Sequence, residues 1–248
     1  MRALVLPVET GDGHRAELIA RIPDAARARL LWLPGMGLPA RQFIPFAEAL
    51  AGRGVAVFLL EWRGIGSSNL RAGGGNDWGY RELLADILAS EAVAEAQAPG
   101  LRRILGGHSL GGQLSCCWLG LRPDAADALW LVASGAPYWR AFPAPTRWWL
   151  PLAYRFLPWL AHRRGYMPGR RIGFGGNEAV GVIDDWSRSA LGGRYAAHGL
   201  EADLEAAQLH GYTTGADRRA GVMKPPWRSP APGPRARPGI RARPARNR

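Results

Sequence analysis

The stretch "ILGGHSLGGQL", residues 104–114, decides how the rest of the chain is interpreted. It places Ser109 between Gly107 and Gly111 in the pattern Gly-x-Ser-x-Gly. The residues before it predict a short strand and those after it predict a helix, so Ser109 stands at the tip of a sharp turn. Flanking glycines let strand and helix approach closely, and the helix N-terminus favours developing negative charge. We therefore predict Ser109 as a nucleophile, with Gly107, His108 and Gly111 supporting its turn.

A second glycine loop, "LWLPGMG" at residues 31–37, also follows a predicted strand and precedes a helix. In serine hydrolases with this strand–turn–helix arrangement, such a loop gives one backbone N–H to the oxyanion, and the residue after the nucleophile gives the other. These donors would be Met36, which follows Pro34 and Gly35, and Leu110. The alternative is an ordinary strand-to-helix turn.

Short apolar runs alternate with amphipathic segments along the first 135 residues. The predicted strands are 2–8 and 15–22, joined as a hairpin, then 28–34, 54–62, 102–107 and 128–134. The predicted helices are 40–54, 81–97 and 110–121, with Leu83, Leu84, Ile87 and Leu88 on one side of the second. This order predicts an α/β fold, with a mostly parallel sheet and helices on both faces.

Residues 136–200 interrupt this rhythm, because they are dense in Trp, Pro, Arg and Gly. We interpret them as a helical cap inserted over the sheet. A helix lying at a membrane surface is the alternative, since Arg147, Arg163 and Arg164 flank an apolar stretch too short to span a bilayer. The expected organisation is a core at 1–135, the cap at 136–200, the start of a C-terminal core at 201–212 and a basic tail at 213–248.

Taken together, "LPGMG", "EWRGIGSS" and "GHSLGG" resemble the α/β-hydrolase family, nearest to its serine aminopeptidase-like and lysophospholipase-like branch. The cap segments "GYMPGRRIGFGG" and "DDWSRSALGGRY" are similar to those of uncharacterised bacterial members. One departure is Leu33-Pro34, where many members have a His-Gly pair. The resemblance implies an α/β-hydrolase fold and a serine hydrolase that cleaves carboxylic-ester or related acyl bonds, with an acid and then a histidine following the cap.

The triad acid and base are not identified. His14 precedes the sheet core, and His108 adjoins Ser109. His162 and His198 fall in the cap, and His210 comes too early in the C-terminal core. We expect His108 to point away from the turn. Asp184 and Asp185 are interpreted as charges at a helix surface or start, and Asp217 follows the last histidine, in the wrong order for the family.

After Tyr212 the apolar periodicity ends. Residues 213–248 hold ten basic residues and one acidic residue, so they carry most of the net charge of +12. This segment is expected to be disordered, and the last strands of the fold to be missing. Arginine replaces lysine almost throughout, so we hypothesise that the gene is GC-rich and that the reading frame is lost between about residues 203 and 216.

The leading hypothesis is therefore a serine hydrolase acting on a small-molecule or lipid-like ester, impaired by the missing acid and base. Aromatic cap residues would suit an apolar acyl group or pack the cap's own core; they are Trp148, Trp149, Phe156 and Trp159. The alternative is a non-catalytic binding protein whose basic tail contacts anionic partners.

The remaining expectations are mostly exclusions. No cofactor motif, metal-ligand spacing, dedicated nucleic-acid module or transmembrane segment is found. Cys116 and Cys117 are interpreted as a buried reduced pair on a helix, and a cytoplasmic location is expected. The oligomeric state is left open.

Overall fold

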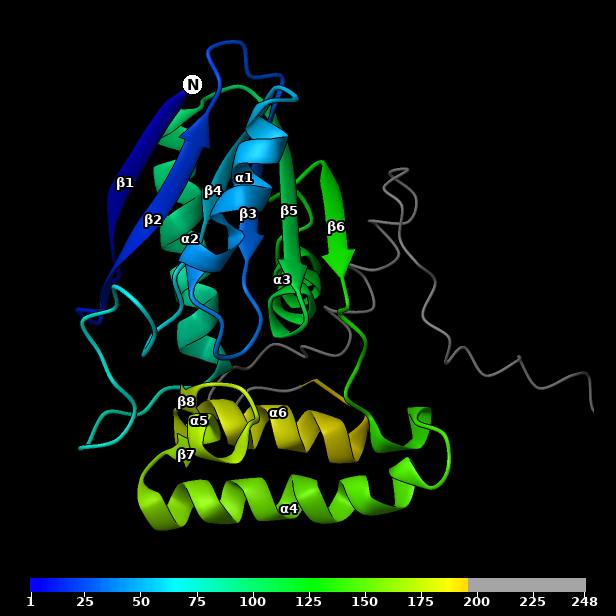
Figure 1. The fold of residues 1–248 in the computed structure, drawn as a ribbon. Helices are drawn as coiled ribbons and strands as arrows, with labels where there is room; N and C mark the ends of the chain where they lie inside the picture. The colour runs from blue at the N-terminus through cyan, green and yellow to red at the C-terminus, as the bar shows by residue number, and fades with distance from the viewer. Residues whose placement is uncertain (196–248) are drawn as a thin grey trace, which may run out of the picture.

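The computed structural model describes residues 1–195, and a six-stranded sheet forms its centre. The strands follow one another in space in the order β1-β2-β4-β3-β5-β6 (Figure 1). Their bounds are β1 Arg2–Glu9, β2 Arg15–Ile22, β3 Ala28–Leu33, β4 Val55–Leu59, β5 Arg102–His108 and β6 Ala128–Val132. The β1–β2 and β2–β4 pairs are antiparallel, whereas β4, β3, β5 and β6 run parallel.

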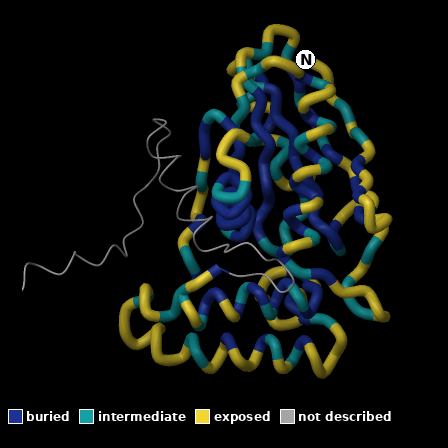
Figure 2. Tube along the Cα trace, turned by 180° about the vertical axis from the view of Figure 1, so that it is seen from behind, coloured by how far each residue is buried: buried dark blue, intermediate teal, exposed yellow. Residues whose placement is uncertain are grey.

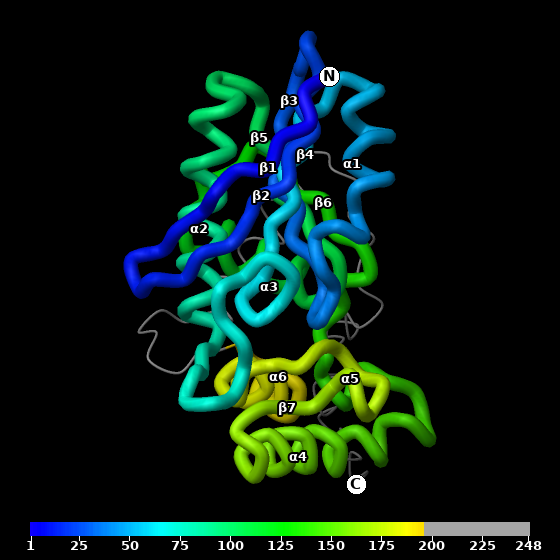
Figure 3. Tube along the Cα trace, turned by 60° about the vertical axis from the view of Figure 1, so that its left-hand side comes forward, coloured from blue at the N-terminus to red at the C-terminus, as the bar shows by residue number. Residues whose placement is uncertain are grey.

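Helices cover both faces of this sheet, as Figure 3 shows from the side. Helix α1 packs on one face, with the short 3-10 turn before it, and α2 and α3 pack on the other. Their bounds are Ala40–Phe43 for the 3-10 turn, Ile44–Ala51 for α1, Tyr80–Gln97 for α2 and Leu110–Leu121 for α3. The α/β fold class predicted from the alternating pattern is thus confirmed.

Burial explains why the strands differ in sequence. Strands β3 and β4 have helices on both sides, and nearly all of their residues are buried, which matches their continuous apolar runs. Strand β2 alternates between exposed and buried residues instead, as a strand with one solvated face must. Helix α3 is buried along almost its whole length. Helix α2 buries Leu83, Leu84 and Ile87, whereas Leu88, expected on the same side, is 47% exposed.

A layer of helices lies beyond the carboxyl ends of the parallel strands (Figure 1). Its elements are a 3-10 turn Trp139–Ala141, α4 Thr146–Arg164, β7 Met167–Pro168, α5 Gly169–Ile172, β8 Asn177–Glu178 and α6 Val180–Gly192. Helices α4 and α6 pack side by side, and the outer turns of α4 are exposed (Figure 2).

Asp185 joins this layer to the sheet-bearing part of the molecule. Its carboxylate accepts a hydrogen bond from the backbone N–H of Tyr80 at 2.9 Å, at the first turn of α2. A carboxylate at this point satisfies a donor that has no partner within the helix. Asp185 is 2% exposed, so its interpretation as a surface charge was wrong, and the helix start at which its carboxylate lies is that of α2, not that of its own helix α6. The predictions for residues 196–248, including the missing strands, the tail and the lost reading frame, lie outside the described residues.

Candidate active site

Ser109 occupies the single residue between β5, which ends at His108, and α3, which begins at Leu110. Its backbone has φ +52° and ψ −118°, a conformation that L-residues rarely adopt. Hydrogen bonds hold the turn on both sides. The Ser109 N–H donates to the Val132 carbonyl at 3.0 Å, and the Ser109 carbonyl accepts from the Gln113 N–H at 3.1 Å. A strained backbone fixed in this way is often found at a reacting group.

The glycines around Ser109 sit where no side chain fits. A Cβ at Gly111 would lie 2.0 Å from the Leu33 carbonyl oxygen, and one at Gly107 would lie 2.4 Å from the Gly111 carbonyl carbon. The N-terminus of α3 therefore lies directly against β3 and β5, which is the close approach expected from the sequence.

The loop after β3 lies next to this turn because β3 and β5 are parallel neighbours, with Leu33 paired to Gly107. Trp62 fixes the loop by donating its indole N–H to the Pro34 carbonyl at 2.8 Å. Met36 follows within the same loop. The sequence analysis assigned no role to Trp62, although it lies in the quoted "EWRGIGSS" motif.

Ser109, Met36, Leu110 and His108 line one cavity of about 310 Å³. The rest of its wall is apolar or glycine, and consists of Gly35, Gly37, Leu38, Phe174, Gly175 and Trp186. The structure thus brings together the predicted nucleophile and both residues predicted to supply oxyanion donors. The lining residues from the helical layer, Phe174, Gly175 and Trp186, were not predicted, although they lie in the quoted segments "GYMPGRRIGFGG" and "DDWSRSALGGRY".

This glycine run packs backbone to backbone against the Met36 loop. A Cβ at Gly37 would lie 2.0 Å from the Gly176 nitrogen. Glu178 fixes the run from behind, because its carboxylate accepts a hydrogen bond from the Gly176 N–H at 3.1 Å. Burial raises the pKa of Glu178 to about 7, against the opposing effects of that hydrogen bond and of Arg170. A buried acid thus supports the wall of the cavity.

The described histidines do not supply a base with a carboxylate partner at Ser109. His162 pairs with Asp184 on an exposed surface, at 2.9 Å. His108 lines the cavity, but its ring lies against Gly35 and 6.3 Å from the Phe43 ring, and among the described residues its buried Nδ1 has no hydrogen-bond partner. His198 and His210 lie outside the described residues.

His14 belongs to a buried serine–histidine–aspartate cluster elsewhere. Its Nδ1 lies 2.9 Å from Asp86 and its Nε2 lies 3.1 Å from the hydroxyl of Ser68. This hydroxyl also accepts hydrogen bonds from the Gly64 and Leu70 N–H groups, each at 3.1 Å. All three members of the cluster are at most 4% exposed, so the hydroxyl is occupied and closed to a substrate.

The exposed aromatic residues of α4 line neither an acyl-group site beside Ser109 nor the core of the helical layer. Trp148, Trp149, Phe156 and Trp159 are 52–69% exposed, and none of them lines the Ser109 cavity. Both readings, acyl-group binding and packing of the cap core, were therefore wrong.

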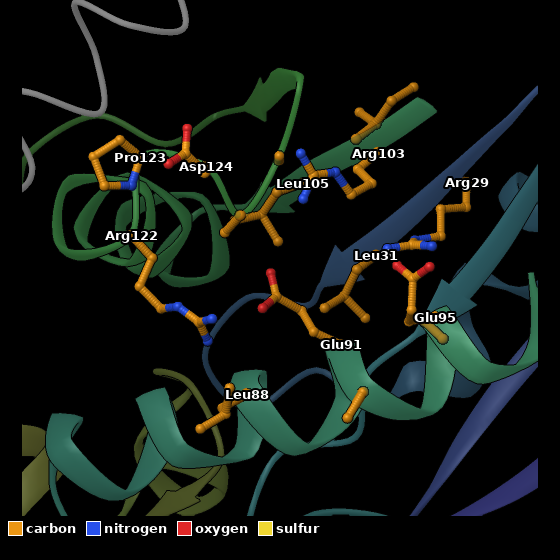
Figure 4. Close-up of a pocket in the computed structure, with 15 residues that line it drawn as sticks. Arg29, Leu31, Leu88, Glu91, Glu95, Arg103, Leu105, Arg122, Pro123 and Asp124 are labelled. Atoms are coloured by element: carbon orange, nitrogen blue, oxygen red, sulfur yellow. Dashed lines mark hydrogen bonds and ion pairs between the residues drawn. The ribbon is translucent and has the colours of Figure 1, made fainter. Parts of the chain in front are cut away.

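A larger cavity of about 570 Å³ lies between α2, α3 and the amino-terminal halves of β3 and β5 (Figure 4). Its charged groups are largely paired: Arg29 binds Glu95, and Glu91 accepts a hydrogen bond from the Trp118 indole at 2.8 Å. Burial raises the pKa of Glu91. Among the described residues that line this cavity there is no serine or histidine, so they offer no counterpart to the arrangement at Ser109.

The strand order β1-β2-β4-β3-β5-β6, together with a strained serine turn between β5 and α3, is that of the α/β-hydrolase class. Within it, the chain belongs to the serine aminopeptidase S33 family, whose model matches residues 24–176.

Similar solved structures share this fold. A lipase in its open form matches with a TM-score of 0.54 and 17% identity, covering 77% of this chain and 74% of that chain. The α/β hydrolase GrgF from Penicillium sp. sh18 matches with a TM-score of 0.53 and 15% identity, covering 86% of each chain. DcsB, in complex with its substrate analogue, matches with a TM-score of 0.50 and 19% identity, covering 65% of this chain. The chain spans 55% of the length of DcsB.

Within residues 1–195, none of the helices has the length and hydropathy of a membrane-spanning segment. No group of three or more His, Cys, Asp or Glu side chains in this part is placed to hold a metal ion.

Proposed function

We propose that the chain is a serine hydrolase of carboxylic-ester or related acyl bonds, with Ser109 as its nucleophile. The observation that carries the proposal is the strained backbone of Ser109 in the wall of a cavity that Met36 and Leu110 also line. The Ser109 oxygen would attack the carbonyl carbon, and the N–H groups of Met36 and Leu110 would hold the resulting oxyanion. Gly107, His108 and Gly111 support this turn.

The cavity favours a small apolar acyl group. Its volume of about 310 Å³ lies at the lower end of the range for small-molecule sites. Phe174, Trp186 and Leu38 give it apolar walls. A small-molecule or lipid-like ester is the substrate class that we infer, and no cofactor is assigned to the reaction.

We infer that turnover is weak. Ser109 needs a base to take its proton, and the described residues place no histidine–carboxylate pair beside it. Serine proteases without their triad retain about 10³–10⁴-fold acceleration over water, through the oxyanion hole and substrate binding. Hydrolysis at that residual level is what we expect of this chain.

The test is hydrolysis of p-nitrophenyl acetate and butyrate by the full chain. Ser109→Ala should reduce hydrolysis to the background rate. Ser115→Ala is the matched control, because Ser115 lies on α3, which begins directly after Ser109, is buried and donates its hydroxyl to the Gly111 carbonyl at 2.8 Å. Equal hydrolysis by Ser109→Ala and the unmodified chain would overturn the proposal. The alternative, a binding protein acting through residues 213–248, would gain weight from that result.

We also infer a reducing, cytoplasmic compartment. The support for it is that Cys116 and Cys117 are both reduced and fully buried.

A further inference from the structure

The outer face of α4 is an uncovered apolar stripe. Trp148, Leu152, Phe156 and Trp159 recur at helical spacing, with Trp149 beside them, and all five are 52–69% exposed. We call these five residues the α4 stripe. Single exposed apolar residues are ordinary, but a continuous row of large ones marks a surface that contacts something else.

The α4 stripe is not needed to hold the helix in place. The opposite side of α4 is anchored through Tyr154, Leu157 and Ala161, which are buried. Tyr154 donates its hydroxyl to the Pro137 carbonyl at 2.8 Å, and its ring meets Trp186 of α6 edge to face at 5.1 Å. The helix thus has two apolar faces on opposite sides, and only the inner one is used by the described residues.

The charges that α4 itself carries are all positive, and Asp184 of α6, which reaches this helix, pairs with His162. Helix α4 contains no acidic residue, and it carries Arg147 near its start, Arg155 midway, and Arg163 and Arg164 at its end. Arg147 lies over the Trp148 ring at 5.8 Å, and Arg163 lies over the Trp159 ring at 5.9 Å. Tryptophan and arginine placed together suit an interface where one side is apolar and the other carries negative charge.

These charges distinguish between possible occupants. Two copies of the chain meeting through α4 would bring arginines face to face without a carboxylate from either helix, which is unfavourable. An anionic lipid surface has the opposite charge, and it accepts tryptophan and phenylalanine rings at the depth of the headgroups and upper acyl chains.

We propose that the α4 stripe docks the protein on an anionic lipid surface, with α4 lying along the plane of the membrane. This inference goes beyond the proposed hydrolase function and does not depend on Ser109. Helix α4 lies beyond the carboxyl ends of the parallel strands (Figure 1), and Ser109 directly follows the carboxyl end of β5. Docking would therefore bring the end that carries the Ser109 cavity to the lipid.

The experiment measures insertion of the tryptophans into vesicles. The full chain is mixed with vesicles of phosphatidylglycerol and phosphatidylcholine whose acyl chains are brominated, because bromine quenches only indoles that reach the apolar layer. The unmodified chain should bind, and its fluorescence should fall. In the fourfold variant Trp148→Gln, Trp149→Gln, Phe156→Gln and Trp159→Gln, the partition coefficient should drop by more than about tenfold, and the quenching should disappear.

Two controls keep the result specific. Leu88→Gln and Val5→Gln change apolar residues that are also exposed, at 47% and 58%, but lie outside the α4 stripe, and these variants should bind as the unmodified chain does. Circular dichroism should show that every variant is folded. Charge attraction between the basic segment 213–248 and the headgroups would give binding without quenching, so the quenching reports on insertion alone.

A variant without the arginines of α4 tests the contribution of charge. Replacing Arg147, Arg155 and Arg163 by Gln should weaken binding to phosphatidylglycerol vesicles and leave weak binding to pure phosphatidylcholine unchanged. Absence of quenching in the unmodified chain, or equal quenching in the fourfold variant, would overturn the proposal. A dimer seen by sedimentation that the fourfold variant abolishes, without vesicle binding, would assign the α4 stripe to a second copy instead.

Discussion

His14 Nε2 lies 3.1 Å from the Ser68 hydroxyl oxygen, yet this pair is buried in the body of the protein and not in a substrate cavity. With Asp86 on the other ring nitrogen, the geometry imitates a catalytic triad. Arg63 binds the same Asp86 carboxylate through its Nε and a terminal nitrogen, at 2.9 and 2.8 Å. The arrangement is therefore a buried ionic network that ties the β1–β2 turn to α2.

Breaking this network should unfold the protein more readily. Asp86→Asn leaves Arg63 buried with one carboxylate fewer, and the free energy of unfolding should fall by about 3–5 kcal/mol. Asp127→Asn is the matched control, because it removes the partner of Arg103 at 37–41% exposure and should cost at most about 1 kcal/mol. Urea denaturation measures both, and equal losses would contradict the structural role given to Asp86.

The close contact of α3 with β3 makes Gly111 irreplaceable. Gly111→Ala places a methyl group 2.0 Å from the Leu33 carbonyl oxygen, and should destabilise the fold by about 3 kcal/mol or more. Gly192→Ala is the control, because a Cβ there meets nothing within 4 Å at the end of α6. Thermal unfolding should show a lower Tm only for Gly111→Ala, and similar Tm values would be inconsistent with the packing described.

Glu178 should make stability depend on pH. Burial raises its pKa in the folded protein to about 7 from an ordinary value of 4.5. Between these values the folded state binds more protons than the unfolded state, so stability falls as pH rises from 4.5 to 7.

Glu178→Gln keeps an oxygen acceptor for Gly176 and removes the titration. The variant should gain up to about 3 kcal/mol relative to the unmodified chain between pH 4.5 and pH 8. Urea denaturation at both pH values measures this difference. A constant difference between the two proteins would show that Glu178 titrates normally.

The thiols should be unreactive in the folded protein. Cys116 and Cys117 are fully buried, and burial raises the pKa of Cys117 to about 12. Ellman's reagent at pH 8 should therefore detect them only after denaturant is added. Rapid modification of the native chain would show that α3 opens, contrary to its tight packing.

Much of the fold was predictable because local sequence patterns determine its strands, helices and turns. Continuous apolar runs identified the parallel strands, and the glycines around Ser109 indicated a sharp turn that the structure places between β5 and α3. Cysteine burial also followed from its position on an apolar helix.

The wall of the cavity was not predictable, because it depends on contacts between distant segments. Gly176 packs against Gly37, which is 139 residues away in the sequence, and no local pattern predicts this contact. Asp185 was likewise interpreted as a surface charge, because the sequence does not show that the first turn of α2 packs beside it. The acyl-group and cap-core readings of Trp148, Trp149, Phe156 and Trp159 failed because periodicity predicts an apolar face without saying which side of the helix faces the protein.

The measurement that tests the central claim most directly is labelling by a fluorophosphonate, in which an activated serine oxygen displaces fluoride from phosphorus. The full chain, Ser109→Ala and Ser68→Ala are incubated with the probe, and the modified peptides are mapped by mass spectrometry. We predict slow modification of Ser109, lost in Ser109→Ala and retained in folded Ser68→Ala. Label on Ser68, or no label on Ser109 after long incubation, would contradict the assignment of Ser109 as the nucleophile.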